Sequence, residues 1–462
     1  MPLILPSNSI SAGGYEVDNS LRYNQNDDCL IKTFGSGGNR KKFTFSLWIK
    51  LSGRGTGNNN GLLIAGTTGN NEGNIKLSND VIDWSEYNTG TASVIGRLTT
   101  SQVFRDYSAW SHLVFVWDSG NATAGNRMRI YHNGSEITSF SDDTNPSLNY
   151  DAQINNNVLH NIGRQSWNNS GDYNGYMAEV CFIDGQALDP TSFGEFDEDS
   201  GIWKPIDVSG LTFGTNGFYL DFENSGSLGA DVSGNGNNFT VNNLTAIDQT
   251  TDTCTNNFCT MNPLDNFYAN STFSEGNNKI VTTTGNYTAN SATFGLSKGK
   301  WYWEVKVTST STEDMIGIRG DQTTASTDYL GGSLYDYAYN SYAKLYNNGS
   351  SPSYGATFTT GDIIGVALDL DSSTNTITFY KNGSGQGSSN ITNVSSTTFG
   401  LYFPSLGDFT SGGSATFEIN FGNPTFTISS GNTDANGYGN FEYEVPDSYL
   451  SLCSANLSEV LG

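Results

Sequence analysis

Alternating carboxylates in the stretch GEFDEDSG (194–201) are the strongest candidate for catalysis in this sequence. On a strand, Glu195, Asp197 and Asp199 would lie on one side, where paired carboxylates can act as general acid and base. A third Glu would complete a Glu-x-Asp-x-x-Glu pattern, but that position is Ser200. The segment contains no Lys or Arg, so we interpret it as a solvated acidic loop.

Other catalytic machinery is missing from the sequence. Its three histidines are His112, His132 and His160, and two of them fall in expected strands beside core residues. There is no Gly-x-Ser-x-Gly, Walker A or His-Glu-x-x-His motif. We therefore expect a protein that is not an enzyme and needs no cofactor. The five cysteines are odd in number and scattered, so neither a zinc site nor a disulfide framework is predicted.

Aromatic, amide and carboxylate side chains occur together in two stretches that could bind a sugar. RQSWNNSGDYNG (164–175) supplies one set, and DVIDWSEYN (80–88) supplies the other. The predicted ligand-binding residues here are Trp84, Tyr87, Trp167, Asn168, Asn169, Asp172 and Tyr173. The alternative is that the tryptophans cap the edge of a sheet.

A tyrosine-rich segment, residues 328–355, is a third candidate surface. Tyrosine gives a large contact area at low entropic cost, as in antibody paratopes. The predicted contact residues are Tyr335, Tyr337, Tyr339 and Tyr342. The alternative is that these alternating tyrosines cover a sheet.

One stretch, DVSGNGNN (231–238), places oxygen-bearing side chains at alternate positions. Asp231, Ser233, Asn235 and Asn237 could wrap a Ca²⁺ ion. The closing bidentate Glu of an EF-hand is absent, so a plain tight turn is the favoured interpretation and Ca²⁺ stays an open alternative.

Composition limits the fold and the partners. Charged residues make up only 15% of the chain, while 54 Gly and many Tyr and Phe predict strands joined by turns. Helical periodicity is nearly absent, so we expect an all-β protein. The net charge of −25 excludes a nucleic-acid-binding surface and disfavours an anionic membrane. The N-terminus does not resemble a signal peptide, and no stretch could span a membrane.

Period-2 patterns define the expected strands. Leu113, Phe115 and Trp117 alternate on one face of one strand, and Asn133-Gly134 follows the next as a hairpin turn. The stretch 174–185 is expected to alternate Tyr176, Ala178, Val180 and Phe182 against Met177, Glu179, Cys181 and Ile183. Residues 299–307 and 376–383 repeat such patterns later in the chain, the latter also ending in Asn-Gly.

These motifs carry two resemblances. FTFSLWIK, WSHLVFVWD, RIYHNG and GYMAEVCFIDGQAL resemble a laminin-G-like (concanavalin A-like) jelly roll, a fold that often binds carbohydrate or protein, sometimes through Ca²⁺. Some members of that fold are glucanases with the Glu-x-Asp-x-x-Glu pattern. KWYWEV, GDIIGVALDLD, TITFYKNG and FEINFG resemble a SPRY (B30.2) domain, a β-sandwich that binds proteins through its loops.

The expected organisation is a jelly roll at 1–205, an ordered β connector at 206–267, a SPRY-like sandwich at 268–428 and a docked C-terminal tail at 429–462. The combination resembles structural proteins of marine bacteriophages. It implies a virion surface protein, a tail fibre or head/capsid fibre, that recognises a host glycan or protein. The alternatives are a decoration or adaptor protein that binds other virion proteins and, with least support, a glycan hydrolase. A homo-oligomer that forms through sandwich faces is expected.

Overall fold

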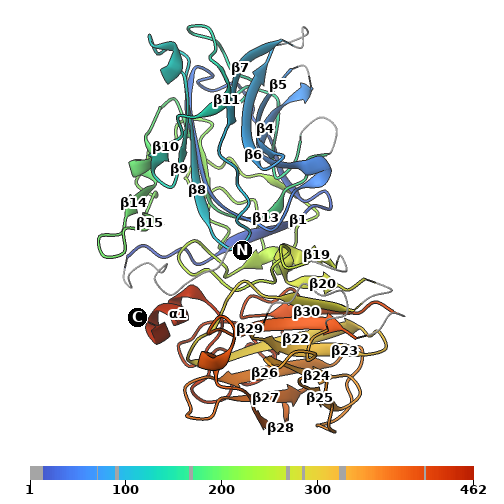
Figure 1. Ribbon diagram of the computed structural model, residues 1–462. Helices are drawn as coiled ribbons and strands as arrows, with labels where there is room; N and C mark the ends of the chain where they lie inside the picture. Colours follow the sequence, from blue (N-terminus) through green and yellow to red (C-terminus); the bar gives the residue numbers. More distant parts are fainter. Residues whose placement is uncertain are drawn as a thin grey trace. The chain divides into compact units, whose positions relative to one another are not determined.

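A computed structural model describes residues 14–69, 71–88, 93–165, 170–266, 271–283, 287–321, 329–409 and 413–461. The chain divides into two compact units, one within Ile10–Thr255 and one within Asn256–Gly462 (Figure 1). Both consist of antiparallel sheets, which confirms the predicted all-β class. In the described part of the chain, the one α-helix is α1 (Ser454–Leu461), and no helix is long and apolar enough to cross a membrane.

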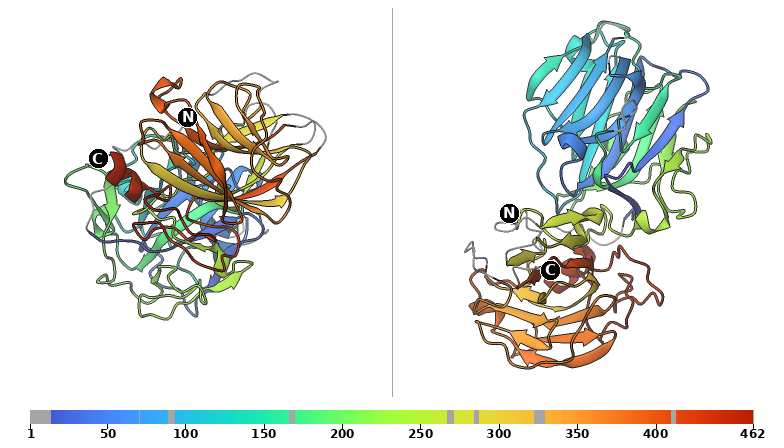
Figure 2. Two further views of the ribbon diagram at one scale, coloured as in Figure 1. Left: turned by 90° about the horizontal axis from the view of Figure 1, so that it is seen from below. Right: turned by 90° about the vertical axis from the view of Figure 1, so that its right-hand side faces the viewer.

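The N-terminal unit contains two eight-stranded sheets and a small hairpin. Figure 2 (right) views its blue-to-cyan strands nearly face-on. The first sheet comprises, in spatial order, β10 (Ser135–Glu136), β9 (Met128–His132), β8 (Ser111–Asp118), β3 (Lys42–Leu51), β13 (Asn174–Asp184), β1 (Ser20–Asn24) and β18 (Gln249–Thr250), with β16 (Phe218–Leu220) also paired to β13. The second comprises β11 (Phe140–Thr144), β7 (Val94–Thr100), β6 (Val81–Tyr87), β5 (Asn71–Ser78), β4 (Asn59–Thr68), β12 (Leu159–Ile162), β2 (Cys29–Thr33) and β17 (Thr240–Asn242). The hairpin joins β14 (Gly194–Phe196) and β15 (Trp203–Pro205).

The main core of this unit lies between its two sheets. Leu113, Phe115 and Trp117 of β8 point into it, as their alternation predicts. The opposite face of β8 is also apolar, and Val114 and Val116 are buried there under the segment that follows β13. A sheet that is covered on both faces explains why its strands read as nearly continuous hydrophobic runs.

The predicted alternation along β13 is wrong beyond residue 178. Ala178 pairs with Trp48 and Cys181 with Ser46, so two residues of β13, Glu179 and Val180, lie opposite one residue of β3. This β-bulge centres on Glu179, which has a φ of +51°. The extra residue moves Val180 to the same core as Met177, although strict alternation would separate them.

The C-terminal unit is a second sandwich. Its seven-stranded sheet comprises β19 (Thr272–Ser274), β20 (Lys279–Val281), β30 (Thr416–Asn420), β22 (Lys300–Ser309), β26 (Ile363–Asp369), β27 (Thr376–Lys381) and β28 (Ser384–Asn390). Its five-stranded sheet comprises β21 (Thr288–Ser291), β29 (Phe403–Asp408), β23 (Asp314–Arg319), β24 (Asp336–Asn340) and β25 (Lys344–Tyr346). Trp301, Trp303 and Val305 fill the core between the sheets, as predicted.

The outer face of the seven-stranded sheet is covered by the C-terminal segment. Tyr302 and Ala367 of that face pack against Phe441 and Val445. Further along, Leu450 forms a bridge to Trp301 at the start of β22. The segment is therefore part of the packed structure of this unit.

Two Asn-Gly turns, one in each unit, are built alike. In the Asn133–Gly134 turn the residues have φ of 46° and 77°, and in the Asn382–Gly383 turn 49° and 77°. Each Asn donates its main-chain N–H to a carbonyl at the start of the neighbouring strand, that of His112 (2.9 Å) or Ile363 (2.8 Å). Its side-chain Oδ1 accepts the N–H of the same residue, at 2.7 and 2.9 Å respectively.

An aromatic ring covers each turn glycine. A Cβ on Gly134 would lie 2.5 Å from the ring of Trp203, and one on Gly383 would lie 2.7 Å from that of Tyr443. Only glycine fits either position, both for its positive φ and for this contact.

The segment expected as a connector, 206–267, supplies strands to the N-terminal unit. Its β16 pairs with β13, β17 with β2 and β18 with β1. The boundary between the compact units falls after Thr255.

Candidate functional site

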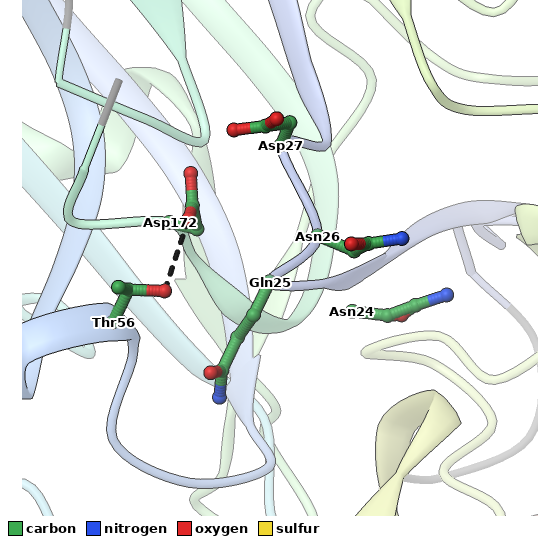
Figure 3. A pocket seen from close by; sticks show the side chains of 6 residues that line it. All are labelled: Asn24, Gln25, Asn26, Asp27, Thr56 and Asp172. Carbon is green, nitrogen blue, oxygen red and sulfur yellow. Dashed lines mark hydrogen bonds between the residues drawn. The ribbon is translucent and has the colours of Figure 1, made fainter. Parts of the chain in front are cut away.

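A polar pocket of about 400 Å³ lies where three loops of the N-terminal unit meet. The loops follow β1, follow β3 and precede β13. Figure 3 shows the lining side chains, which are all polar: Asn24, Gln25, Asn26, Asp27, Thr56 and Asp172.

The loop between β1 and β2 is a tight turn. The main-chain N–H of Asn24 donates to Oδ2 of Asp28 at 2.8 Å, and Gln25 and Asp27 both have positive φ, 65° and 67°. Asn243 clamps the turn from outside, because its Nδ2 donates to Oδ1 of Asp28 and to the carbonyl oxygen of Asn26. This geometry leaves Asn26 and Asp27 exposed at the pocket.

Asp172 forms the inner wall of the pocket. Its Oδ2 accepts a hydrogen bond from Thr56 Oγ1 at 2.9 Å (Figure 3), while Oδ1 is buried and has no hydrogen-bond partner in the described part of the chain. The residue is only 6% exposed. Burial, reinforced by the charge of Asp27, raises the pKa of Asp172.

Asp27 forms the outer rim and carries a partly neutralised charge. Its side chain is 63% exposed, and Oδ1 lies 3.0 Å from Nη1 of the largely buried Arg164. The pocket thus combines two carboxylates, three amides and a hydroxyl group. Such a set can accept and donate hydrogen bonds to the adjacent hydroxyl groups of a sugar or another polyol.

Of the sugar-binding residues predicted in the first half, Asp172 is the only one among the described residues that lines this pocket. Trp84 is 1% exposed and packs edge-on against Phe115 in the core, so it cannot stack on a ligand. Tyr173 is also buried, with its hydroxyl directed at the carbonyl of Tyr176. Tyr87 is half-buried on β6. The remaining predicted residues, Trp167, Asn168 and Asn169, lie outside the described residues.

The other pocket residues were missed because they come from separate loops. A signal was present in the run NQNDD (24–28), in which five consecutive amide and carboxyl side chains follow an apolar strand. Thr56 has no such signal, because an isolated threonine in a Gly/Asn-rich loop is common in this chain.

The tyrosine-rich segment divides between core and surface. Tyr337 and Tyr339 of β24 belong to the core of the C-terminal unit, which matches the alternative that these tyrosines cover a sheet. Tyr335 is half-buried against the same core, whereas Tyr342 is 50% exposed. They therefore form no continuous tyrosine surface.

The residues considered for Ca²⁺ form a turn. Asp231 Oδ1 accepts the N–H of Tyr219 (3.0 Å) and of Ser233 (2.9 Å), and its Oδ2 accepts that of Asn237 (2.7 Å). The side-chain amides of Asn235 and Asn237 both donate to the carbonyl of Gly217. Nowhere among the described residues do three His, Cys, Asp or Glu side chains gather as a metal site.

The acidic stretch 194–201 is less solvated than predicted. Glu195 is exposed on β14, whereas Asp197 is buried and its Oδ1 accepts the N–H and Oγ–H of Ser200. Lys204 lies 3.6 Å from Glu195 and 3.1 Å from Asp197. One cation just beyond the stretch thus forms ion pairs with both carboxylates.

The histidines are held in structural hydrogen bonds. Burial lowers the pKa of His112 to about 3 and that of His160 to about 4. His132 lies between Gln102 and Ser111: Nε2 of Gln102 is 3.1 Å from its Nδ1, and Oγ of Ser111 is 3.2 Å from its Nε2. With the amide donating to Nδ1, the imidazole proton sits on Nε2 and points at Ser111.

Each of the two units contains a match to a known protein family. Residues 25–191 match the concanavalin A-like lectin/glucanases superfamily, and residues 300–423 match the SPRY domain. The chain contains a concanavalin A-like domain followed by a SPRY domain. Both resemblances found in the sequence are thereby confirmed, and both domains support a binding role.

Solved structures match the SPRY domain at low identity. The SPRY domain of human HERC1 is 19% identical, with 34% of this chain and 96% of that one covered at a TM-score of 0.28. A second human SPRY domain is 21% identical, with coverage of 33% and 94% and a TM-score of 0.26. Stonustoxin is 19% identical over 35% of this chain and 27% of its own, at a TM-score of 0.29. A search of curated proteins gave no match.

Proposed function

We propose that this protein is a non-enzymatic binding protein of a phage virion surface, part of a tail fibre or head/capsid fibre. Its concanavalin A-like domain recognises a host surface glycan in the pocket between Asn24 and Asp172. The observation that carries this proposal is Oδ1 of the buried Asp172, which has no hydrogen-bond partner among the described residues and lies in a pocket lined by polar side chains. The virion location rests on the resemblance of nearly the whole chain to structural proteins of marine bacteriophages.

The chemistry of the pocket favours a hydroxyl-rich ligand. On the inner wall, the hydrogen-bonded side chains of Asp172 and Thr56 present oxygen atoms that can accept hydrogen bonds from a ligand. At the rim, Asn26 and Asp27 offer further polar groups. Sugar recognition requires such convergent polar groups on a rigid scaffold. The two sheets of the domain supply that scaffold.

Binding of the purified protein to glycan arrays and host envelope fractions tests the proposal. Asp172→Asn and Thr56→Ala should each weaken binding at least about tenfold, because a lost hydrogen bond to a charged group costs roughly 1.5–3 kcal/mol. Asp151→Asn is the matched control, since Asp151 is an exposed carboxylate of the same unit that does not line the pocket. No binding by the wild-type protein, or equal binding by all variants, would refute the proposal.

Incubation with the bound polysaccharide tests the non-enzymatic part. No release of oligosaccharide is expected. Turnover that Glu195→Gln abolishes would instead identify a glycan hydrolase.

A second function is an adaptor or decoration protein that binds other virion proteins. The observation that favours it is the exposed edge of the SPRY domain at β28, which carries no charged side chain. Locating the chain in a virion density map distinguishes the two functions. A fibre tip position supports host recognition, and a position between capsid or tail proteins supports the adaptor.

A further inference from the structure

One edge strand of the SPRY domain differs from every other sheet edge described. β28 ends the seven-stranded sheet, at the side opposite β19 (Figure 1). It is seven residues long, SGQGSSN, and five of the seven are exposed. An exposed edge strand presents free main-chain N–H and C=O groups that can pair with another strand.

The remaining edges carry features that prevent such pairing. β11 bears Asp142 and Asp143, β10 is two residues long and contains Glu136, and β25 is three residues long and begins with Lys344. β17, β18 and β19 have only two or three residues each, as have β14, β15 and β16, and β21 is mostly buried. Short length and charge are the usual protections of a sheet edge. β28 carries no charged side chain and, at seven residues, is the longest of the uncharged edge strands described.

The outer side of β28 pairs with no other strand in the described part of the chain. Apart from its ladder to β27, the hydrogen bonds of its main chain there are to two side chains: Tyr354 donates to the carbonyl of Gly387, and Gln386 to that of Ser384. The half that runs from Ser388 to Asn390 pairs regularly with β27, so its outward groups keep the spacing of an ordinary strand. This half is the part able to accept a further strand.

The absence of charged residues around β28 favours a second copy of this chain as the partner. Residues 382–407 contain no Asp, Glu, Lys, Arg or His, although the chain carries a net charge of −25. Most surfaces of two copies of so acidic a chain repel one another, whereas β28 places no like charges face to face. Its Ser, Gln and Asn side chains can each donate and accept hydrogen bonds, so they are self-complementary.

We propose that β28 pairs with β28 of a second copy of this chain, antiparallel across a two-fold axis, so that the two seven-stranded sheets become continuous. This interface uses the SPRY domain and is independent of the glycan pocket. It is isologous, because each strand supplies to its partner the same groups that it receives.

Light scattering after size exclusion, between about 1 and about 100 μM protein, tests this pairing. The wild-type protein should shift with concentration from the chain mass of 49.8 kDa to twice that mass. Ser388→Lys combined with Asn390→Lys should abolish the shift, because four lysines would then meet at the axis. Ser225→Lys combined with Ser227→Lys, at two exposed positions of a loop in the other unit, adds the same charge and should leave the shift intact.

Hydrogen exchange of the full-length protein gives a second measurement that does not depend on the variants. The amides among residues 388–390 that face away from β27 should exchange several-fold more slowly at the high concentration, with unchanged exchange in β26. A monomer at all concentrations, or a dimer that the edge lysines leave intact while the variant melts like wild type, would overturn the proposal.

Discussion

Glu304 on β22 accepts the main-chain N–H of Tyr443 at 2.8 Å, although the two residues lie 139 positions apart. Its other oxygen accepts the N–H of Glu442 and the amide of Asn420. The carboxylate is fully buried, and burial raises its pKa. A buried carboxylate persists only where several donors satisfy it, so this group fastens the C-terminal segment to the sheet.

Replacing Glu304 with Gln should destabilise the C-terminal unit by about 3 kcal/mol, because the new NH₂ group would face donors in place of an acceptor. Chemical denaturation gives the free energy of unfolding, and limited proteolysis should cut first between residues 437 and 450. Glu444→Gln, an exposed carboxylate in the same segment, is the control and should change little. Equal stability of both variants would show that Glu304 does not hold the segment.

Glu179 should make the N-terminal unit less stable as the pH rises. Burial raises its pKa to about 7 from 4.5, despite hydrogen bonds from the hydroxyls of Tyr15 and Tyr219. A raised pKa means that the folded state binds the proton more tightly. Its contribution to stability is therefore complete below pH 4.5 and is lost progressively as the pH rises to about 7.

Melting temperatures of wild type and Glu179→Gln between about pH 4 and 8 test this dependence. The variant cannot ionise at this position. The free energies of unfolding derived from the two sets of melts should therefore coincide near pH 4.5 and differ by up to roughly 3 kcal/mol at pH 7 and above, with the variant more stable. Parallel curves across this range would contradict the assigned titration.

Tyr354 should hold β28 against β27. The ladder is irregular between Thr378 and Tyr380, and there the hydroxyl of Tyr354 accepts the N–H of Phe379 (3.3 Å) and donates to the carbonyl of Gly387. Tyr354→Phe should cost about 1–2 kcal/mol and speed amide exchange at Phe379. Tyr342→Phe, at a side chain that is half exposed, is the control. Unchanged exchange at Phe379 would argue against the bridge.

Gly134→Ala should destabilise the N-terminal unit by about 2–3 kcal/mol. Roughly 1 kcal/mol comes from the positive φ, and the rest from the clash with Trp203. Gly349→Ala isolates the backbone contribution, since Gly349 has a φ of 72° and a Cβ added there would meet nothing within 4 Å. Thermal denaturation of both variants should therefore show the larger loss for Gly134, and equal losses would exclude the ring contact as a constraint.

The regular parts of both sandwiches are predictable from local pattern. Leu113, Phe115 and Trp117, like Trp301 and Trp303, alternate because each strand has one face in the main core. The bulge at Glu179 breaks this rule, since a single residue with positive φ shifts the alternation without a Gly or Pro to mark it. Burial of Trp84 was likewise missed, because its polar neighbours suggested an exposed loop whereas it lies within β6.

The candidate site is harder to predict because it is assembled from distant loops. Asp172 stands out by its type and setting, but its partner Thr56 is 116 residues away. Such pairs form because β1 and β3 end next to the point where β13 begins, and this arrangement is set by the order of the strands in the sheet. Aromatic residues near the site in sequence, such as Tyr173, instead fill the core.

The cover over each Asn-Gly turn has a consequence for dividing the chain. The SPRY match ends at residue 423, so a fragment cut there would lose Tyr443, uncover Gly383 and deprive Glu304 of its main-chain donors. A fragment cut at residue 191, where the other match ends, would lose Trp203 and the strand β16. Each sandwich should therefore be expressed with its covering segment, ending at Thr255 or beginning at Asn256, if it is to stay soluble.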